Sequence, residues 1–290
     1  MSTSSKISLA ASGLTGLVGS RVKQLTEDYF EWINFSPTTG IDITQINPVM
    51  DLVSGLSGRV FVNFSGFTDL SAAQKQQGNQ AGSCYQLNVI GPKNLSRACK
   101  KFGKHLIHLS TDAVFDGQKP KPYIETDSPH PISWYGQTKF WGEQEILASG
   151  CEYTIARIAY PFRAEFKPKT DFVRKIISQL SQNRTVSMFT DTRFTPTFVD
   201  DIAVAIKAII LKPATGIFHC VGSNIISPFA AAQDIAAAFH FNPNLILKTH
   251  NHSYPPNAGL LNHKATSQLG VNFLTFRQAL DQLQRQLKSP

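Results

Sequence analysis

A glycine-rich loop between a short apolar strand and a helix constrains the fold of this chain more than any other feature. The residues KISLAAS (6–12) have the pattern of a strand, SGLTGLVGS follows directly, and residues 17–30 have the apolar spacing of a helix. Gly13, Gly16 and Gly19 are spaced G-x-x-G-x-x-G. Glycines here allow a tight turn, close approach of the backbone to a pyrophosphate, and close packing of helix on strand. A plain turn needs only one or two of them, so their place after the first strand is what predicts dinucleotide binding.

Strand-like and helix-like segments alternate strictly through the first half of the chain. This alternation indicates a parallel sheet covered by helices on both faces. We therefore predict an α/β fold, a Rossmann-like doubly wound parallel sheet with a smaller C-terminal substrate-binding lobe. The Rossmann domain is expected over 1–157 and 198–222, and the lobe over 158–197 and 223–290. Strands are expected at 6–12, 31–35, 58–64, 104–110, 152–158 and 216–222, and helices at 17–30, 46–56, 85–103, 134–149, 171–182, 227–241 and 275–287. Pro92 must start or kink its helix, and Ser227 before Pro228 fits an N-cap.

Composition excludes several classes of protein. The 290 residues contain no apolar run near the roughly 20 residues of a membrane span. The N-terminus resembles a signal peptide only faintly, because glycines and threonine interrupt it. Four widely separated cysteines without a C-x-x-C pair favour a reduced, cytoplasmic protein and predict no metal site. His250 and His252 are interpreted as solvated loop residues. The net charge of +8 is dispersed, which argues against nucleic acid and suits a ligand that carries phosphates.

A tyrosine and a lysine lie four residues apart in SWYGQTKFWGE, on a predicted helix. Side chains at i and i+4 share a helix face, so the Lys139 ammonium is expected beside the Tyr135 phenol. Such proximity would lower the tyrosine pKa and suit it to proton transfer. The strand at 104–110 runs into Ser110, Thr111 and Asp112 at the sheet edge where ligands of such folds bind. Together these residues predict a nicotinamide enzyme in which Thr111 holds a substrate carbonyl.

With these motifs the chain resembles the extended short-chain dehydrogenase/reductase superfamily. The stretches LSTDAVFDG, PYIETDSPHPISWYGQTKFWGE and TPTFVDDIA resemble, more narrowly, the dTDP-4-dehydrorhamnose reductase family. That resemblance covers most of the chain and is firmest over 59–157. It implies nicotinamide-dependent reduction of a nucleotide-linked 4-keto-6-deoxy sugar.

The resemblance also assigns roles to individual positions. The catalytic residues it implies are Thr111, Tyr135 as proton donor, and Lys139. The cofactor residues it implies, together with those of the glycine loop, are Gly13, Leu14, Thr15, Gly16, Leu17, Val18, Gly19, Asp42, Ile43, Asn63, Ser65, Gly66, Phe67, Ser110, Tyr135 and Lys139. The substrate residues are Thr111, Asp112, Phe115, Tyr160 and Asn257. Asn88 matches a helix asparagine of the superfamily, or is a polar residue that only stabilises its helix.

The second strand is expected to end at Phe35 and Ser36, where an acidic residue would hold the ribose of NAD. The acid is missing and Arg21 is available for a 2′-phosphate, which favours NADP(H) over NAD(H). Three positions depart from the family pattern. Tyr160 replaces its usual tryptophan, and in YPPNAGLL Tyr254 and Ala258 replace an arginine and a serine. These departures leave open which sugar and which nucleotide is bound.

Several functions compete with a reductase. A 4,6-dehydratase is disfavoured, because Asp112 is followed by Ala113 instead of the usual glutamate. A sugar-nucleotide 4-epimerase of the same superfamily remains an alternative. So does a non-catalytic NADP-binding partner protein like the regulatory β subunit of methionine adenosyltransferase. The expected partner is a nucleotide-sugar substrate, with neither nucleic acid nor membrane, and the oligomeric state is left open, a homodimer included.

Overall fold

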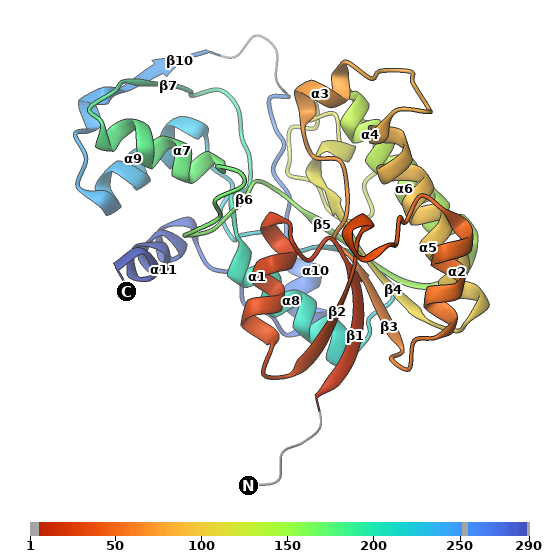
Figure 1. Ribbon diagram of the computed structural model, residues 1–290. Helices are drawn as coiled ribbons and strands as arrows, with labels where there is room; N and C mark the ends of the chain where they lie inside the picture. The colour runs from red at the N-terminus through yellow and green to blue at the C-terminus, as the bar shows by residue number, and fades with distance from the viewer. Residues whose placement is uncertain (1–5, 251–254, 289–290) are drawn as a thin grey trace, which may run out of the picture. The chain divides into compact units, whose positions relative to one another are not determined.

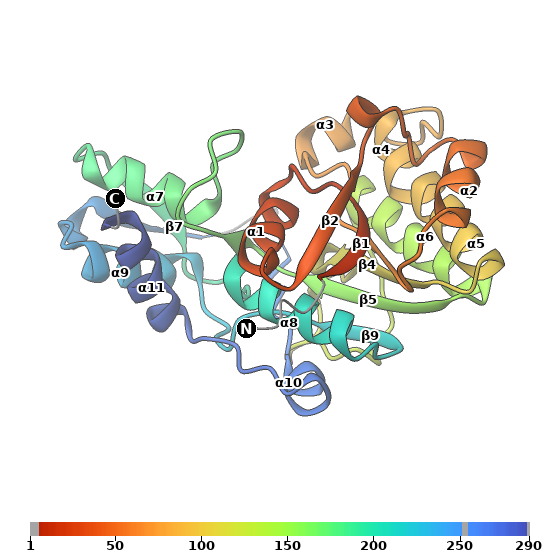
Figure 2. The same ribbon diagram turned by 60° about the horizontal axis from the view of Figure 1, so that its bottom comes forward.

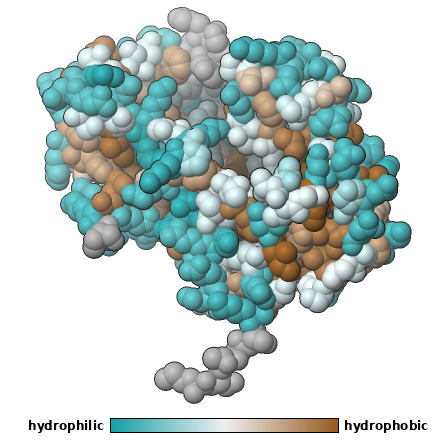
Figure 3. Space-filling view, in the orientation of Figure 1, coloured by the Kyte–Doolittle hydropathy of each residue, from teal (hydrophilic) through white to brown (hydrophobic). Residues whose placement is uncertain are grey.

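The computed structural model describes residues 6–250 and 255–288. The chain divides into two compact units, drawn in Figure 1. Unit 1 comprises residues 1–115, 129–157 and 203–218, and unit 2 comprises residues 116–128, 158–202 and 219–290. In Figure 3, hydrophobic residues show between hydrophilic ones in each unit.

Unit 1 is built on a six-stranded sheet with the order β2-β1-β3-β4-β5-β9. The pairs β1–β2, β1–β3 and β3–β4 are parallel, and in register Ser12 lies beside Asn63, and Asn63 beside His108. The order reverses beside β1, the place where ligands bind in such sheets. The strands are β1 (Ile7–Ser12), β2 (Phe30–Phe35), β3 (Val60–Asn63), β4 (His105–Thr111), β5 (Glu152–Ile158) and β9 (Gly216–His219).

Helices cover both faces of this sheet, as Figures 1 and 2 show. On one face lie α2 (Ile46–Ser54), α5 (Gly91–Lys101) and α6 (Trp134–Ser149), and on the other α1 (Leu17–Thr26) and α8 (Val199–Leu211). A buried apolar core that includes Phe61, Leu95, Leu106 and Ile146 joins the first set to the sheet. The short helices α3 (Leu70–Gln74) and α4 (Ser83–Tyr85) precede α5. The predicted α/β architecture of parallel strands and covering helices is confirmed.

The helix predicted over 85–103 is divided. A π-helical turn at Gln86–Ile90 separates α4 from α5, and Pro92 lies in the first turn of α5. Proline is tolerated there because the first amides of a helix need no partner within it. The turn lies against Gly142 of α6 so closely that a Cβ on this glycine would stand 2.1 Å from the Asn88 carbonyl oxygen.

Unit 2 has two small parallel sheets that the sequence analysis did not predict. One pairs β6 (Pro161–Phe162) with β8 (Thr197–Phe198), and the other pairs β7 (Val186–Phe189) with β10 (Ile246–Thr249). Its helices are α7 (Phe172–Ser181), α9 (Pro228–Phe239), α10 (His263–Leu269) and α11 (Phe276–Lys288). The side chain of Ser227 accepts a hydrogen bond from the amide of Ala230, as its N-cap pattern predicted.

The units differ from the expected domains at three segments. Residues 116–128, 198–202 and 219–222, all expected in the Rossmann domain, belong to unit 2. Backbone hydrogen bonds explain the first: the amide of Tyr123 donates to the carbonyl of Gly259 at 2.8 Å, and the amide of Leu261 donates to the carbonyl of Tyr123 at 2.9 Å. This pairing joins positions far apart in sequence, which local patterns do not reveal.

Candidate active site

The glycine loop has the geometry that its spacing predicted. Gly13 has φ +76°, and a Cβ there would stand 2.6 Å from the Ser65 amide nitrogen, so only glycine fits without strain. A Cβ on Gly19 would stand 2.4 Å from the Gly13 carbonyl oxygen, which requires close packing of helix on loop. Gly16 is exposed and is the N-cap of α1, with no side-chain cap. This helix N-terminus therefore fits an anion such as a pyrophosphate.

The remaining residues of the loop divide by burial. Leu14 and Val18 are buried, whereas Thr15 is exposed and Leu17 is half-buried. Leu14 and Val18 thus anchor the loop to unit 1, whereas Thr15 and Gly16 are exposed and Leu17 is partly exposed.

Asp42 and Ile43 follow a turn after β2. The Asp42 carboxylate accepts a hydrogen bond from the amide of Thr44 at 2.9 Å, and Ile43 is buried with its carbonyl bonded to Asn94 at 3.1 Å. Ser36, the residue that follows β2, caps a short 3₁₀ turn in which its amide is bonded to the Thr39 hydroxyl. As predicted, β2 ends without an acidic side chain.

The segment after β3 is held by two asparagines. Asn63 is buried, and its Oδ1 accepts hydrogen bonds from the Ser12 hydroxyl at 2.7 Å and the Ser65 amide at 3.0 Å. Asn88 accepts from the Phe67 amide at 2.9 Å and donates to the Thr138 hydroxyl at 3.1 Å. Asn88 therefore clamps the segment onto α6, a function that the sequence could not separate from simple helix stabilisation.

Gly66 lies within this segment. A Cβ on it would stand 3.2 Å from the Asn88 Oδ1 and 3.7 Å from the Lys139 Nζ. A side chain larger than hydrogen would therefore approach the ammonium that the sequence assigned to catalysis.

The end of β4 presents three polar residues. The Thr111 hydroxyl donates to the Asp112 carboxylate at 2.9 Å and accepts from the Ala113 amide at 3.2 Å. Burial raises the pKa of Asp112 to about 6, against the lowering effect of the Thr111 hydrogen bond. Ser110 is buried, and its hydroxyl has no hydrogen-bond partner among the described residues. Such an orphaned hydroxyl fits a polar group of a bound cofactor.

The Tyr135 and Lys139 side chains project from the first two turns of α6, which Ser133 caps through a hydrogen bond from the Gly136 amide at 3.1 Å. Burial raises the pKa of Tyr135, although a hydrogen bond with the Thr111 hydroxyl lowers it, and Asp112 raises it further. The expected lowering of the tyrosine pKa is therefore wrong for this structure. The reason is burial of the phenol, and Lys139 does not offset it: its Nζ donates to the Leu109 carbonyl at 2.6 Å, and burial lowers the pKa of this lysine to about 8.

Two tryptophans of α6, Trp134 and Trp141, pack against each other. The rings of Trp134 and Trp141 meet edge to face with centroids 5.5 Å apart, and Tyr85 packs against Trp141 at 6.0 Å. Both tryptophans thus act in packing.

A buried ion pair that the sequence analysis missed ties α6 to β5. Glu143 is fully buried, and its two oxygens accept from the Arg157 Nε at 3.0 Å and Nη2 at 2.6 Å. The Arg157 guanidinium also lies over the ring of Phe115, 5.1 Å from its centroid. Phe115, expected to contact substrate, is buried under this guanidinium. The only sequence signal was a glutamate four residues after Lys139, on the same helix face.

Tyr160 and Asn257, the other expected substrate residues, belong to unit 2. Tyr160 is 43% exposed, has φ +41° and packs its ring 4.6 Å from the ring of Phe194. Asn257 donates to the Lys119 carbonyl at 3.0 Å and accepts from the Gly259 amide at 3.2 Å. Ala258 bonds through its amide to the Arg193 carbonyl, and Tyr254 lies outside the described residues.

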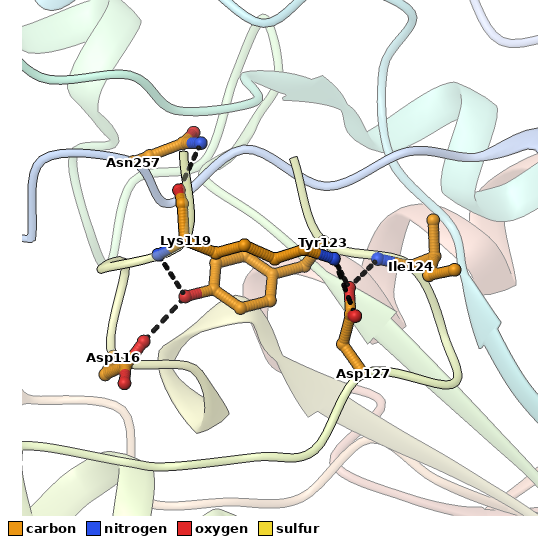
Figure 4. A network of polar contacts seen from close by, with 6 residues as sticks. All are labelled: Asp116, Lys119, Tyr123, Ile124, Asp127 and Asn257. Atoms are coloured by element: carbon orange, nitrogen blue, oxygen red, sulfur yellow. Dashed lines mark hydrogen bonds and ion pairs between the residues drawn. The ribbon is translucent and has the colours of Figure 1, made fainter. Parts of the chain in front are cut away.

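The segment 116–128 is held by a polar network in unit 2, shown in Figure 4. The Tyr123 hydroxyl donates to the Asp116 carboxylate at 2.6 Å, and the Lys119 ammonium binds Asp127 at 2.6 Å. Asp127 also accepts from the Ile124 amide at 2.8 Å. Side-chain hydrogen bonds and an ion pair therefore hold the segment that lies between Thr111 and Tyr135 in the sequence.

Within the described ranges, no helix is both long enough and apolar enough to cross a bilayer. Nor do His, Cys, Asp and Glu side chains of these ranges gather in threes as a metal site would require. His250 lies 3.6 Å from the Asp191 carboxylate, and His252 lies outside the described residues.

Comparison with known proteins supplies the family. A model described as the RmlD substrate binding domain matches residues 7–289. A dTDP-4-dehydrorhamnose reductase of Mycobacterium tuberculosis is 29% identical over 215 residues, 72% of this chain and 69% of that protein. A dTDP-4-keto-6-deoxy-D-glucose reductase of Streptomyces niveus is 29% identical over 208 residues, 71% of this chain and 70% of that protein.

The fold has a solved counterpart as well. The crystal structure of dTDP-4-dehydrorhamnose reductase from Bacillus anthracis, in complex with NADP, superposes with a TM-score of 0.88 at 24% identity, covering 98% of this chain and 100% of that one. At this identity the likeness shows the fold alone. The family model, which spans almost the whole sequence, carries the assignment: the chain belongs to the RmlD substrate-binding domain family, that of the dTDP-4-dehydrorhamnose reductases.

Proposed function

We propose that this protein is an NAD(P)H-dependent reductase that converts the 4-keto group of a nucleotide-linked 6-deoxy sugar to an alcohol. One observation carries the proposal: Thr111, at the carboxyl end of β4, lies close enough to Tyr135 for its side chain to oppose the rise in the pKa of that phenol, and Tyr135 stands one helical turn from the buried Lys139. The activities named for the Mycobacterium and Streptomyces relatives, both reductases of dTDP-linked keto sugars, support it.

A reduced nicotinamide cofactor, when bound, would supply the hydride that the carbonyl carbon accepts. Tyr135 gives its phenolic proton to the carbonyl oxygen, and the C=O bond becomes CH–OH. Burial raises the pKa of Tyr135, so the phenol is protonated at neutral pH and can act as the donor. The Thr111 hydroxyl would bind the same oxygen, and the Lys139 ammonium or amine would hold the nicotinamide ribose.

The glycine loop, the Asn63-to-Phe67 segment and Ser110 would hold the cofactor. Three features fit a dinucleotide: the tight glycine turn at Gly13, the N-terminus of α1 without a side-chain cap, and the Ser110 hydroxyl without a partner among the described residues. Asp42 and Ile43 would lie near the adenine.

We propose further that NADP(H) is preferred over NAD(H). NAD binding ordinarily uses an acid at the end of the second strand, and here β2 ends at Phe35 and is followed by Ser36. The Ser36 hydroxyl lies 2.6 Å from the Thr38 hydroxyl, so neutral hydrogen-bonding groups occupy this position. Replacing Ser36 with aspartate is expected to weaken NADP binding more than NAD binding, as measured by titration of protein fluorescence with each cofactor. Equal effects on the two cofactors would contradict this preference.

Substrate selection is proposed to involve Asp112, Phe115, Tyr160 and Asn257. We propose that the lobe at 158–197 and 223–290 carries residues that bind the substrate. Tyr160 and Ala258 depart from the family pattern, and the assay below decides whether these departures change the substrate or mark a loss of activity. Asn257→Ala should raise KM for the sugar nucleotide while leaving cofactor affinity unchanged.

The function is tested by following oxidation of NADPH and NADH with dTDP-4-dehydrorhamnose, dTDP-4-keto-6-deoxy-glucose and their UDP, GDP and CDP counterparts. Tyr135→Phe is expected to lose about 10²–10⁴-fold in turnover while retaining cofactor binding. Tyr153→Phe, on β5 of the same unit, is the matched control and should keep its activity. Absence of turnover with every keto sugar would refute the proposal.

Two alternatives have distinct outcomes in this assay. A 4-epimerase would interconvert alcohol epimers with no net consumption of the cofactor. A non-catalytic NADP-binding partner would bind NADP without any turnover, and Tyr135→Phe would leave its partner affinity unchanged.

A further inference from the structure

A chain of buried side chains leads from the first strand of unit 1 to Lys139. The Ser12 hydroxyl bonds Asn63, the Asn63 Nδ2 lies 2.9 Å from the His108 Nδ1, and the His108 Nε2 lies 3.3 Å from the Lys139 Nζ. All four residues are buried, and they come from β1, β3, β4 and α6. Neither the family assignment nor the proposed reaction gives Ser12 or His108 a function.

The orientation of Asn63 determines which atoms carry protons. The Ser65 backbone amide can only donate, so the atom of Asn63 that it contacts at 3.0 Å must be the oxygen. The Asn63 NH₂ group therefore faces His108 and can only donate to it. His108 Nδ1 must then be the unprotonated acceptor, and the neutral ring carries its single proton on Nε2.

This tautomer directs an N–H group at the Lys139 Nζ. An ammonium has three donors and no acceptor, so at 3.3 Å it would oppose the His108 N–H, whereas a neutral amine would accept it with its lone pair. The amine can still donate to the Leu109 carbonyl at 2.6 Å. The contact is therefore satisfied only by the neutral lysine.

The other ionisable groups near Lys139 do not reverse this preference. Glu143, on the same helix, is engaged by both Nε and Nη2 of Arg157. Cys84 of α4 bonds the Thr138 hydroxyl at 3.3 Å, and burial raises its pKa, which keeps the thiol neutral. The Glu143 carboxylate, and Cys84 if it were a thiolate, would raise the pKa of Lys139, yet burial is the larger effect and lowers it. Burial and the nearby lysine also lower the pKa of His108, in agreement with a neutral ring.

We propose that His108 is a positioning residue for Lys139: held by Asn63 in the tautomer with its proton on Nε2, it directs a hydrogen-bond donor at Nζ and favours the neutral amine. This inference deepens the proposed function and rests on it, since only there does Lys139 serve the reaction. In the cofactor-free protein, Lys139 would then exchange a proton near neutral pH.

The first test measures the histidine tautomer in the full-length wild-type protein. Long-range ¹H–¹⁵N correlation spectra of ¹⁵N-histidine-labelled protein distinguish the two tautomers, and the His108 signal is the one missing from His108→Phe. We expect the neutral Nε2–H form at pH 7, because burial and the nearby Lys139 lower the pKa of His108 below the ordinary histidine value. A His108 that is protonated at neutral pH, or that carries its proton on Nδ1, would overturn the proposal.

The second test reverses the polarity of the chain with Asn63→Asp. An aspartate keeps both acceptor contacts to Ser12 and Ser65 but now requires a donor from His108, so the proton moves to Nδ1 and Nε2 becomes an acceptor for the ammonium. The Lys139 titration, followed by ¹³Cε lysine spectra and assigned with Lys139→Arg, is expected to move upward by about one unit or more. If the His108 tautomer changes in this variant but the Lys139 titration does not move, His108 does not influence the protonation of Lys139 and the proposal is refuted.

His105→Gln is the matched control for damage to β4. His105 is also buried on this strand, but its Nε2 bonds the Thr154 hydroxyl at 2.7 Å. This variant should leave the Lys139 titration in place, and a shift equal to that of Asn63→Asp would contradict a specific role for His108. The wild-type tautomer measurement needs no variant, so it decides the question even if Asn63→Asp fails to fold.

These readouts require no substrate. An inactive protein with His108 in the expected tautomer would refute the proposed function and leave the proton arrangement standing. An active reductase in which His108 carries its proton on Nδ1 would support the proposed function and refute the proton arrangement.

Discussion

Replacing Glu143 with alanine is expected to lower the free energy of unfolding of unit 1 by about 3–5 kcal/mol, because it leaves the Arg157 charge buried without its partner. The two side chains are each 1% exposed, and their two contacts of 3.0 and 2.6 Å form a bidentate pair. Arg157 Nη1 already has no hydrogen-bond partner among the described residues, so no spare acceptor can replace the carboxylate. With typical stabilities of about 5–15 kcal/mol, this loss is a large fraction of the total.

A second ion pair of the chain serves as the control, because its N···O distance is similar but its side chains are exposed. Arg59 and Glu152 lie 3.0 Å apart with side chains 69% and 57% exposed. Solvent screens such a pair, so Arg59→Ala should change the free energy of unfolding by about 0–1 kcal/mol. The difference between the two variants isolates burial as the cause.

The assay is urea unfolding followed by tryptophan fluorescence, since Trp32, Trp134 and Trp141 are the only tryptophans of the chain and all belong to unit 1. For slopes of about 1–3 kcal/mol per molar urea, Glu143→Ala should move the midpoint down by about 1 M or more. Replacing both Glu143 and Arg157 with methionine should lower the free energy of unfolding by less, because no unpaired charge stays buried. A loss below about 1 kcal/mol in Glu143→Ala, or a loss equal to that of Arg59→Ala, would refute the reasoning.

Three further predictions concern other parts of the chain. Gly13→Ala should abolish the thermal stabilisation by NADP, since its Cβ would stand 2.6 Å from the Ser65 amide nitrogen at φ +76°; an unchanged stabilisation would contradict the cradle. Gly142→Ala should lower the fluorescence-detected midpoint, because its Cβ would stand 2.1 Å from the carbonyl oxygen of Asn88 in the π-helical turn, and a neutral effect would argue against this close packing. Burial raises the pKa of Asp201 from 3.8 to about 6, so the folded protein holds this proton more tightly than the unfolded chain, and the free energy of unfolding should fall as pH rises from about 4 to 6. Asp201→Asn should remove that fall in urea unfolding followed by circular dichroism between pH 4 and 8, and an undiminished fall would rule Asp201 out as its source.

The elements that the sequence predicted are those encoded by neighbouring residues. Helix α6 begins and ends at the residues its pattern indicated, because Ser133 supplies the cap and Gly150 adopts the left-handed conformation that ends it. The glycine loop was also predicted from neighbouring residues. The positive φ of Gly13 and the close backbone contacts at Gly13 and Gly19 leave no room for side chains at these positions. In the candidate site the sequence brought Thr111, Tyr135 and Lys139 together, through the resemblance and the helical spacing.

What the sequence could not predict depends on contacts between distant segments. The π-helical turn arises where α4, α5 and α6 pack, and the two small sheets of unit 2 pair strands of two to four residues that carry no periodic signal. Residues 116–128 belong to unit 2 because their backbone pairs with residues 259–261, well over a hundred positions away.

Residue type and short-range spacing were enough to predict the order of the elements and the glycine loop, and the family resemblance added the proposed catalytic residues. The proton states of the candidate site follow from the tertiary structure. Burial raises the pKa of Tyr135 and lowers that of Lys139, and the Lys139 Nζ, expected beside the phenol as an ammonium, donates to a β4 carbonyl. The cause is that desolvation and hydrogen-bond geometry depend on what surrounds a side chain in space, which local sequence patterns do not encode.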